Sequence, residues 1–233
     1  GSGTYTINKN TTNLTLTITP STSETYGTGT TATGSGCPSQ ITCNLYRNGS
    51  LVSNPDVSTL AAATYNYTYN TTGNANYTSA SNSSNLTVSK ATGSIFTYLN
   101  NSRANTTIEQ YNAIYLNSTL ETGAGTIKLY NNGILINQGT SPLSNLTNFT
   151  TTGLFNITSY YDGNENYTSD LEIWYVNVTE LDVTLPYVLI LHPQNTTYSS
   201  VQTQLNYSAS DNVALDKCWY STNLGVANTT ITC

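Results

Sequence analysis

The sequence predicts an all-β protein made of tandem β-sandwich domains. Its composition is dominated by Thr and Tyr, which favour strands, and by Asn and Gly, which mark turns. Polar and apolar residues alternate in short runs, and a block of roughly 85 residues occurs twice, a spacing that suits small domains rather than short solenoid repeats. Only 8% of the residues are charged, yet 19 Tyr residues distinguish the chain from disordered proteins, which are poor in aromatics.

Alternation assigns the two faces of the first predicted strands. In Asn13–Thr19 the even positions are apolar and the odd positions are Asn or Thr, and in Tyr65–Asn70 tyrosines alternate with Asn and Thr. Successive side chains of a strand point to opposite faces. We therefore expect the apolar residues and tyrosines to face a core and the Asn and Thr residues to face outward.

The internal repeat organises the chain into domains. The segment Leu45–Val52 (LYRNGSLV) recurs as Leu129–Ile136 (LYNNGILI), with a hairpin turn expected at RNG and at NNG. The segment Thr71–Ser81 recurs as Tyr161–Leu171 in the same order. Short alternating strands separated by turn signals predict a β-sandwich in each copy. The predicted boundaries are 1–10 for an orphan strand, 11–90 and 91–180 for two domains, and 181–233 for a partial third domain.

These motifs resemble the Ig-like repeats of archaeal and bacterial extracellular surface and filament proteins. The likeness covers residues 11–180 and rests on the LY-x-NG hairpin, the alternating tyrosines and the GNxNYTS turn before the last strand. It implies an Ig-like fold, in which the Tyr of that turn packs near the end of the sandwich, and says almost nothing about a ligand. The matching turn positions are Gly73, Asn74 and Tyr77, and then Gly163, Asn164 and Tyr167.

The stretch from Leu181 onward differs from the two copies. Its apolar run Pro186–Pro193 is too short to span a bilayer and is expected to form a buried strand. The Cys-Trp-Tyr-Ser segment resembles another Ig-like class of archaeal surface proteins, which implies that Trp219 packs on a disulfide at Cys218. Residues 181–233 are fewer than either copy, so an incomplete Ig-like domain is expected.

Four cysteines occur in two close pairs, Cys37 with Cys43 and Cys218 with Cys233. Zinc sites use CxxC pairs or additional His ligands, whereas CPSQITC has another spacing and His192 is the one histidine. We therefore expect two disulfides, each closing a hairpin, and hence an oxidising, extracellular location at the cell surface or beyond it.

Acceptor sites for N-linked glycans are unusually frequent. Shuffling a chain of this composition would give roughly nine, about half the number present. Where the Asn lies on a predicted strand, it shares the outward face with the Thr or Ser two residues later, so N-linked glycans are expected on the outer surface. The acceptor residues are Asn10, Asn13, Asn48, Asn66, Asn70, Asn76, Asn82, Asn85, Asn100, Asn105, Asn117, Asn145, Asn148, Asn156, Asn166, Asn177, Asn195, Asn206 and Asn228.

The residues do not favour catalysis. His192 would have to serve a Ser-His-Asp site, but it lies where a strand meets a turn, which suits a turn residue better. A carboxylate pair of the glycosidase type would have to come from the acidic residues of the second copy, where Asp162 and Asp170 align with Thr72 and Ala80 of the first. The four acidic residues in question are Asp162, Glu165, Asp170 and Glu172. No phosphate-binding loop, HExxH motif or nucleophile elbow is present, so an enzyme is not expected.

A calcium site at Asp211 and Asp216 is the remaining metal hypothesis, and a polar turn between strands is the favoured alternative. No cofactor is expected. A net charge of −6 with six basic residues leaves no basic face for nucleic acid or for anionic lipid.

Two classes of function remain. The first is a structural subunit of an extracellular filament or cell-surface stalk that binds copies of itself head to tail. The second is an adhesin that binds glycans or a partner cell through tyrosine-rich surfaces, which can stack on sugars. Tyrosines gathered in the open on one face would favour adhesion, and tyrosines alternating into cores would favour the structural role.

The start of the chain, GTYTINKN, has the pattern of Asn85–Thr92, which ends the first copy. The segment Thr4–Asn8 is therefore expected to be the final strand of a domain that the chain does not itself contain, with Tyr5 and Ile7 pointing into a core. Either the chain, which lacks Met, is processed or is part of a longer one, or this strand completes the last domain of a neighbouring copy by strand addition. The second account gives an open head-to-tail polymer.

Overall fold

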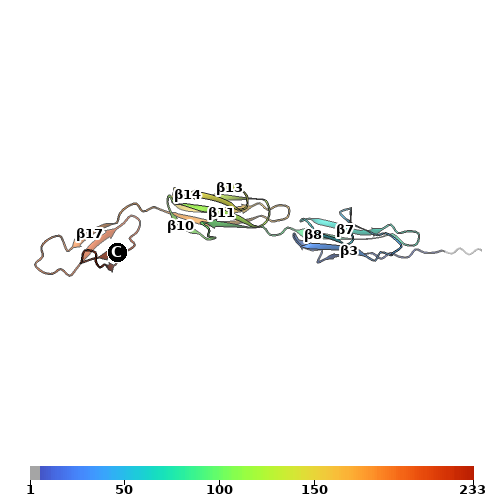
Figure 1. Cartoon of the computed structure of the whole chain (residues 1–233), viewed down its shortest axis with the longest axis horizontal. Helices are drawn as coiled ribbons and strands as arrows, with labels where there is room; N and C mark the ends of the chain where they lie inside the picture. The colour runs from blue at the N-terminus through green and yellow to red at the C-terminus, as the bar shows by residue number, and fades with distance from the viewer. Residues whose placement is uncertain (1–5) are drawn as a thin grey trace, which may run out of the picture. The chain divides into compact units, whose positions relative to one another are not determined.

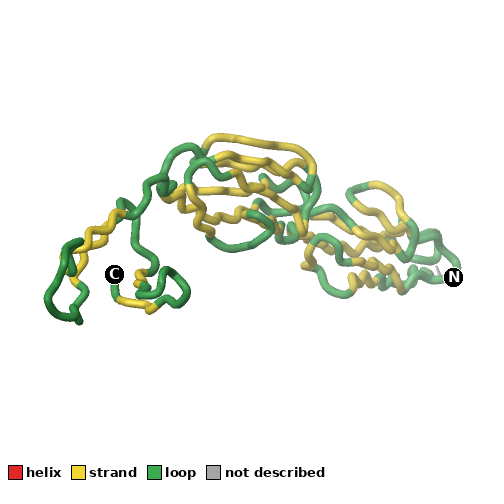
Figure 2. The backbone as a smooth tube through the Cα atoms, turned by 60° about the vertical axis from the view of Figure 1, so that its left-hand side comes forward, coloured by secondary structure: helices red, strands yellow, loops and turns green. Residues whose placement is uncertain are grey.

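The computed structural model describes residues 6–233, and these residues form strands and loops without a helix (Figure 1; Figure 2). The all-β class is therefore as the composition and alternation predict. The strands are β1 (Thr15–Thr19), β2 (Ser23–Thr25), β3 (Gly29–Ser35), β4 (Asn44–Arg47), β5 (Ser50–Val52), β6 (Asp56–Thr59), β7 (Thr64–Thr71), β8 (Ala80–Ser89), β9 (Ser94–Leu99), β10 (Thr106–Glu109), β11 (Ala113–Thr122), β12 (Thr126–Asn131), β13 (Ile134–Thr140), β14 (Leu143–Asn148), β15 (Gly153–Tyr161), β16 (Asp170–Thr179), β17 (Tyr187–His192), β18 (Asn206–Ser210), β19 (Cys218–Tyr220) and β20 (Thr229–Ile231).

The first sandwich consists of a three-stranded sheet, β1-β3-β6, and a five-stranded sheet, β2-β8-β7-β4-β5. Its strand pairs are antiparallel except for β2 and β8, which run parallel. The predicted alternation is confirmed, since the odd positions of β1 are exposed and Tyr67 and Tyr69 of β7 are buried. The buried apolar core consists of Leu14, Ala32, Leu45, Tyr67, Tyr69, Leu86 and Val88.

The second sandwich repeats this order strand for strand. Its sheets are β14-β11-β9 and β10-β16-β15-β12-β13, and β10 pairs parallel with β16 as β2 does with β8. The chain therefore contains tandem Ig-like β-sandwiches. The fully buried residues of the second core include Ile95, Leu99, Leu116, Ile127, Leu129, Ile157, Tyr161 and Val176.

The LY-x-NG motif forms the predicted hairpin in both sandwiches. Asn48 and Gly49 have φ values of 49° and 79°, and Asn132 and Gly133 have φ values of 48° and 77°. Two consecutive positive φ angles are the geometry of a two-residue type I′ turn, which Asn-Gly favours. This requirement explains why the motif recurs.

The third part of the chain is a pair of two-stranded sheets, β17-β18 and β19-β20, that do not close a sandwich within residues 181–233. The prediction of a buried strand at Pro186–Pro193 is wrong in part: β17 is a strand, but residues 187–191 are exposed. Trp219 is 60% exposed and does not pack on a bridge as the resemblance implied. Both differences have one cause, because no second sheet covers the apolar face of these hairpins.

Candidate functional site

Three strand-borne glycan acceptor residues, and Asn13 just before β1, lie on outer faces. Asn13, Asn66, Asn85 and Asn177 are exposed, and each adjoins an inward-facing apolar residue. Asn66 and Asn85 are opposite each other on β7 and β8, and the Nδ2 of Asn66 donates to the Oδ1 of Asn85 at 2.9 Å. Glycans on both residues would project from the same area on the outer face of the sheet.

No acceptor Asn is fully buried, but six are half-buried: Asn70, Asn82, Asn117, Asn145, Asn156 and Asn166. Asn82 departs most from an outward orientation, because it lies on the same side of β8 as the buried Leu86, and its Nδ2 donates to the carbonyl oxygen of Leu14 at 3.1 Å. Its even spacing from Leu86 was the sequence signal for this orientation.

Both predicted disulfides are present, Cys37 with Cys43 and Cys218 with Cys233. The first links the segment after β3 to the start of β4. The second sandwich has no cysteines there and instead uses the hydroxyl of Tyr161, which donates to the carbonyl oxygen of Ala124 at 3.0 Å and accepts from its amide at 3.2 Å. The disulfide is thus a local addition to the repeat.

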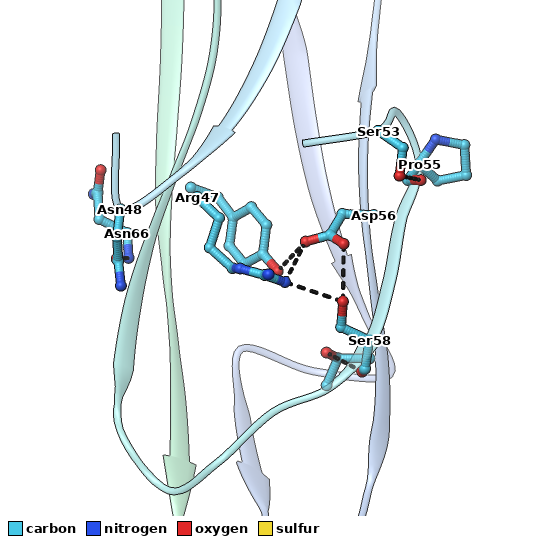
Figure 3. A network of polar contacts seen from close by, with 9 residues as sticks. Arg47, Asn48, Ser53, Pro55, Asp56, Ser58 and Asn66 are labelled. Carbon is cyan, nitrogen blue, oxygen red and sulfur yellow. Dashed lines mark hydrogen bonds and ion pairs between the residues drawn. The ribbon is translucent and has the colours of Figure 1, made fainter. Parts of the chain in front are cut away.

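A buried polar network crosses the first sandwich between its two sheets (Figure 3). Asp56, only 6% exposed, accepts hydrogen bonds at its Oδ2 from Arg47 Nη1 at 2.7 Å and from the Tyr67 hydroxyl at 2.8 Å. Its other oxygen accepts from Ser58 Oγ at 2.8 Å, and Arg47 also donates to Ser58 Oγ at 3.0 Å. Sequence reasoning missed this cluster, although a lone Arg on a strand beside a core tyrosine was a usable signal.

The network is structural in character, because every oxygen of Asp56 is already engaged by side chains of the same sandwich. Burial is the main cause that raises the pKa of Tyr67 above its ordinary 10.0, with Asp56 adding to it and the Arg47 cation opposing it. A phenol with a raised pKa stays protonated and is a poor base at neutral pH.

The second sandwich has mostly apolar residues at the positions that correspond to this network. By the shared strand register, Arg47, Asp56 and Tyr67 align with Asn131, Leu143 and Ile157. Leu143 and Ile157 are both buried. The first repeat therefore joins its sheets here with a hydrogen-bonded charge pair, whereas the second has two buried apolar side chains and Asn131 at these positions.

The acidic residues of the second sandwich are held apart in separate interactions. Glu172 pairs with Arg103 at 2.5 Å and accepts the Thr97 amide, while Asp162 pairs with Lys128 at 2.7 Å. Burial alone would raise the pKa of Glu172, but the hydrogen bonds from Arg103 and from Thr97 outweigh it, so the pKa lies below 4.5.

The other two acidic residues do not change this picture. Asp170 accepts the backbone amide of Ile95 at 2.9 Å, and Glu165 is an exposed residue of the GNENYTS turn. No two of these four carboxylates are therefore both unpaired and directed at one another, as a glycosidase pair would be.

The remaining candidates lie in the third part. His192 ends β17, and its ring packs edge-on against Tyr198 with centroids 5.8 Å apart. Asp211 accepts the amide of Asn212 at 2.6 Å in a turn. Within residues 6–233, no three His, Cys, Asp or Glu side chains lie together as a metal site requires, and no helix is long and apolar enough to cross a bilayer.

The third part has an open apolar groove of about 1120 Å³. Its lining comes from β17, β18, β19 and β20 and includes Val188, Ile190, Tyr207, Trp219 and Ile231. The two hairpins leave these side chains without a covering sheet.

The predicted donor strand lies at the edge of the described chain. Tyr5 is outside the described residues, and Ile7 is 93% exposed and belongs to no strand among residues 6–233. The expectation that both residues enter a core of another domain is not tested by the structure and stays a prediction.

The exposed tyrosines are dispersed. Tyr115 projects from β11 and Tyr175 from β16, which belong to different sheets of the second sandwich, while Tyr67, Tyr69 and Tyr161 are buried. Tyr111, which is 60% exposed, lies between β10 and β11, and the half-buried Tyr130 and Tyr160 lie on the neighbouring strands β12 and β15.

The junction of the first two sandwiches involves no spacer. β8 ends at Ser89, and Ala91 already forms a parallel bridge with Tyr167 of the second sandwich. The ring of Tyr26 packs edge-on against that of Tyr167, with centroids 5.3 Å apart. All of these residues lie within one compact unit of the chain.

No protein-family model and no curated protein sequence matches the chain. Similar solved structures include the fibronectin(III)-like modules of Clostridium thermocellum CbhA, with 14% identity and a TM-score of 0.32 over 72% of this chain and 94% of that one. The titin domains Z1Z2 in complex with telethonin share 17% identity, with a TM-score of 0.40 over 71% of this chain and 97% of theirs. A third is SGBP-B of Bacteroides ovatus in complex with a mixed-linkage heptasaccharide, with 9% identity and a TM-score of 0.25, covering 72% and 66% of the two chains. The assignment of Ig-like sandwiches therefore rests on the strand order of the chain itself.

Proposed function

We propose that the chain is a structural subunit of a heavily N-glycosylated extracellular filament or cell-surface stalk built from serial Ig-like domains. The observation that carries this proposal is the spacer-free junction, in which the last strand of one sandwich leads within two residues into the first pairing of the next. A junction without a flexible linker suits domains that follow one another in series rather than independently tethered modules.

The surface and the disulfides support the same role. Asn13, Asn66, Asn85 and Asn177 are exposed beside inward-facing residues, so a glycan on any of them would meet no buried side chain. Disulfides persist in oxidising compartments, which supports a location outside the cell. Because only 8% of the residues are charged, few acidic and basic groups of the fold titrate.

Copies join head to tail by strand complementation in this proposal. The apolar groove of residues 181–233 exposes unpaired edges and lacks a covering strand, and the Thr4–Asn8 segment of a neighbouring copy has the alternation that such a strand needs. Ile7 would enter the groove together with Tyr5. Since donor and acceptor lie on different parts of the subunit, the contact does not close on itself and gives a filament.

Electron microscopy of the purified full chain tests this role. We expect filaments from the unmodified chain and monomers from Ile7→Asp, because a carboxylate in the apolar groove leaves a buried charge unpaired. The matched control is Ile134→Asp, an exposed apolar residue at the tip of the β12–β13 hairpin, which should leave the filaments intact. Filaments that survive Ile7→Asp would exclude strand complementation, and a monomeric unmodified chain would exclude the filament role.

The alternative, an adhesin for glycans or a partner cell, is tested separately. Sugar binding of the tyrosine-stacking type needs aromatic rings gathered in the open, whereas Tyr115 and Tyr175 of the second sandwich lie on different sheets. Binding of the purified chain to a panel of immobilised glycans, lost on Tyr115→Ala or Tyr175→Ala, would favour adhesion over the structural role.

A further inference from the structure

The first sandwich begins with the same backbone geometry as the second. Asn10 forms a parallel bridge with Tyr77, and Ala91 forms the corresponding bridge with Tyr167. In both, the N–H of the bridging residue donates to the carbonyl of the Asn just before the Tyr, at 2.8 Å in the first sandwich and 2.9 Å in the second. Lys9 precedes the first bridge as Lys90 precedes the second.

We call the end of a sandwich where the chain enters and this bridge forms its entrance. In the second sandwich, the preceding domain covers the entrance. Asn166 accepts the backbone amide of Ala62 at its Oδ1, at 2.9 Å. The Nζ of Lys90 donates to the carbonyl oxygen of Asn164 at 2.6 Å. Together with the edge-on ring contact of Tyr26 on Tyr167, these interactions fix one sandwich on the entrance of the next.

The first sandwich has the same entrance without its cover. We call Asn74, Asn76 and Tyr77 the entrance pole, since they align with the three covered residues of the GNENYTS turn. Asn74 and Asn76 are exposed, whereas Asn164 and Asn166 are half-buried beneath the preceding domain. The difference lies in what covers them, since the turns share one sequence pattern and one backbone geometry.

The entrance pole holds its shape without an occupant. The Tyr77 hydroxyl donates to Gln40 Oε1 at 3.0 Å, and Asn74 Nδ2 donates to the carbonyl of Gln40 at 3.3 Å. The Oδ1 of Asn74 accepts the amides of Asn76 and Tyr77, as Asn164 does in the second sandwich. A preorganised surface of this kind loses little entropy on docking.

We propose that the entrance pole is the docking surface for a further Ig-like repeat of the same type, one that leads into Lys9 through its final strand. The occupant presents three groups that the existing junction defines: an aromatic ring at the position of Tyr26, a free backbone N–H at that of Ala62, and a lysine ammonium at that of Lys90. Lys9 supplies the last of these, to the carbonyl of Asn74. This proposal needs no polymerisation, and it excludes strand complementation, because Thr4–Asn8 cannot be both the final strand of this repeat and the added strand of a neighbour's third part.

The test extends the chain with a known repeat. A second copy of residues 10–90 replaces residues 1–9, so that its own terminal lysine takes the position of Lys9 in front of Asn10. The readout is the chemical shift of the Tyr77 ring in NMR spectra of the extended chain and of the original chain. We expect the Tyr77 ring resonances to move to values close to those of Tyr167, because an edge-on aromatic partner shifts them through its ring current.

Two Tyr26→Ala variants make the result decisive. The variant in the added copy should return the Tyr77 resonances to their original positions. The same variant in the original chain should shift Tyr167 and leave Tyr77 unchanged. Tyr77 resonances that do not respond to the added repeat would overturn the proposal, and so would a Tyr167 ring that is insensitive to Tyr26→Ala. Neither outcome depends on whether the chain forms filaments.

Discussion

Gly34 on β3 lies against the ring of Tyr69 on β7, so closely that a Cβ on Gly34 would be 2.5 Å from ring carbons. Tyr69 is 3% exposed and fills the space that the missing side chain leaves. By strand register, the second sandwich has Ser118 and Ser159 at these two positions, both fully buried. The two sandwiches thus pack the same pair of positions in different ways, once with a large ring against a glycine and once with two small side chains.

Gly34→Ala is expected to destabilise the first sandwich by about 1–3 kcal/mol, because overpacking forces the Tyr69 ring or the strand to move. Gly29→Ala on the same strand is the matched control, since the nearest atom to its Cβ is 4.0 Å away. Urea unfolding of the full chain, followed by tyrosine fluorescence, measures both. Equal midpoints for the two variants would show that the Tyr69 contact does not limit this position.

Tyr67→Phe should cost the first sandwich about 1–3 kcal/mol, because Asp56 loses a buried hydrogen-bond donor. Tyr65→Phe on the same strand removes only an exposed hydrogen bond to Ala61 and serves as the control. Since the pKa of Tyr67 is raised in the folded chain, the stability that it contributes is present below pH 10.0 and is lost as the pH rises through the folded pKa. Tyr67→Phe should therefore reduce the alkaline sensitivity seen in unfolding curves, and an unchanged alkaline profile would contradict this.

Glu172→Gln tests how the stability of the second sandwich depends on pH in the acid range. The pKa of Glu172 is lowered, so its contribution to stability is present above 4.5 and is lost as the pH falls through the folded pKa. The unfolding midpoints of the unmodified chain and of Glu172→Gln should differ at pH 6 and converge in acid. Glu121→Gln, an exposed residue of the same sandwich, should show no such convergence. A constant difference between the Glu172 curves from pH 6 to pH 2 would rule out the ion pair with Arg103 as its cause.

Mass spectrometry of native protein should find glycans on Asn13, Asn66, Asn85 and Asn177, whose side chains leave the outer faces of strands. Asn82 is the internal comparison and should be bare, because a glycan there would displace its hydrogen bond to Leu14 and face the sandwich interior. Peptides that carry no glycan at these four exposed residues would contradict the proposed glycosylated surface.

Local patterns predicted the strands, the two hairpin turns, the repeat and both disulfides, because each depends on neighbours in sequence. Period-two alternation fixes which side of β7 is buried, and the positive φ angles at Asn48 and Gly49 require the Asn-Gly pair that the sequence displays. The exposure of β17 was missed, because an apolar run has the same pattern whether or not a second sheet covers it.

Contacts between distant residues could not be predicted in the same way. Arg47, Asp56 and Tyr67 come from three strands, and their meeting depends on how two sheets face each other. The contacts of Ala62 with Asn166 and of Tyr26 with Tyr167 join residues of different domains. No periodicity in one domain encodes them, although comparing the two copies position by position shows where each repeat departs from the other.

The parallel pairing of the second and last strands of each sandwich has a mechanical consequence. Ser23, Glu24 and Thr25 pair in register with Thr87, Val88 and Ser89, and β10 pairs with β16 in the same sense. When the two ends of such a domain are pulled apart, parallel strands are loaded in shear, and their backbone hydrogen bonds must break together. An antiparallel pair joined at one end would instead open bond by bond. Each sandwich thus resists stretching through the backbone hydrogen bonds of its parallel strand pair.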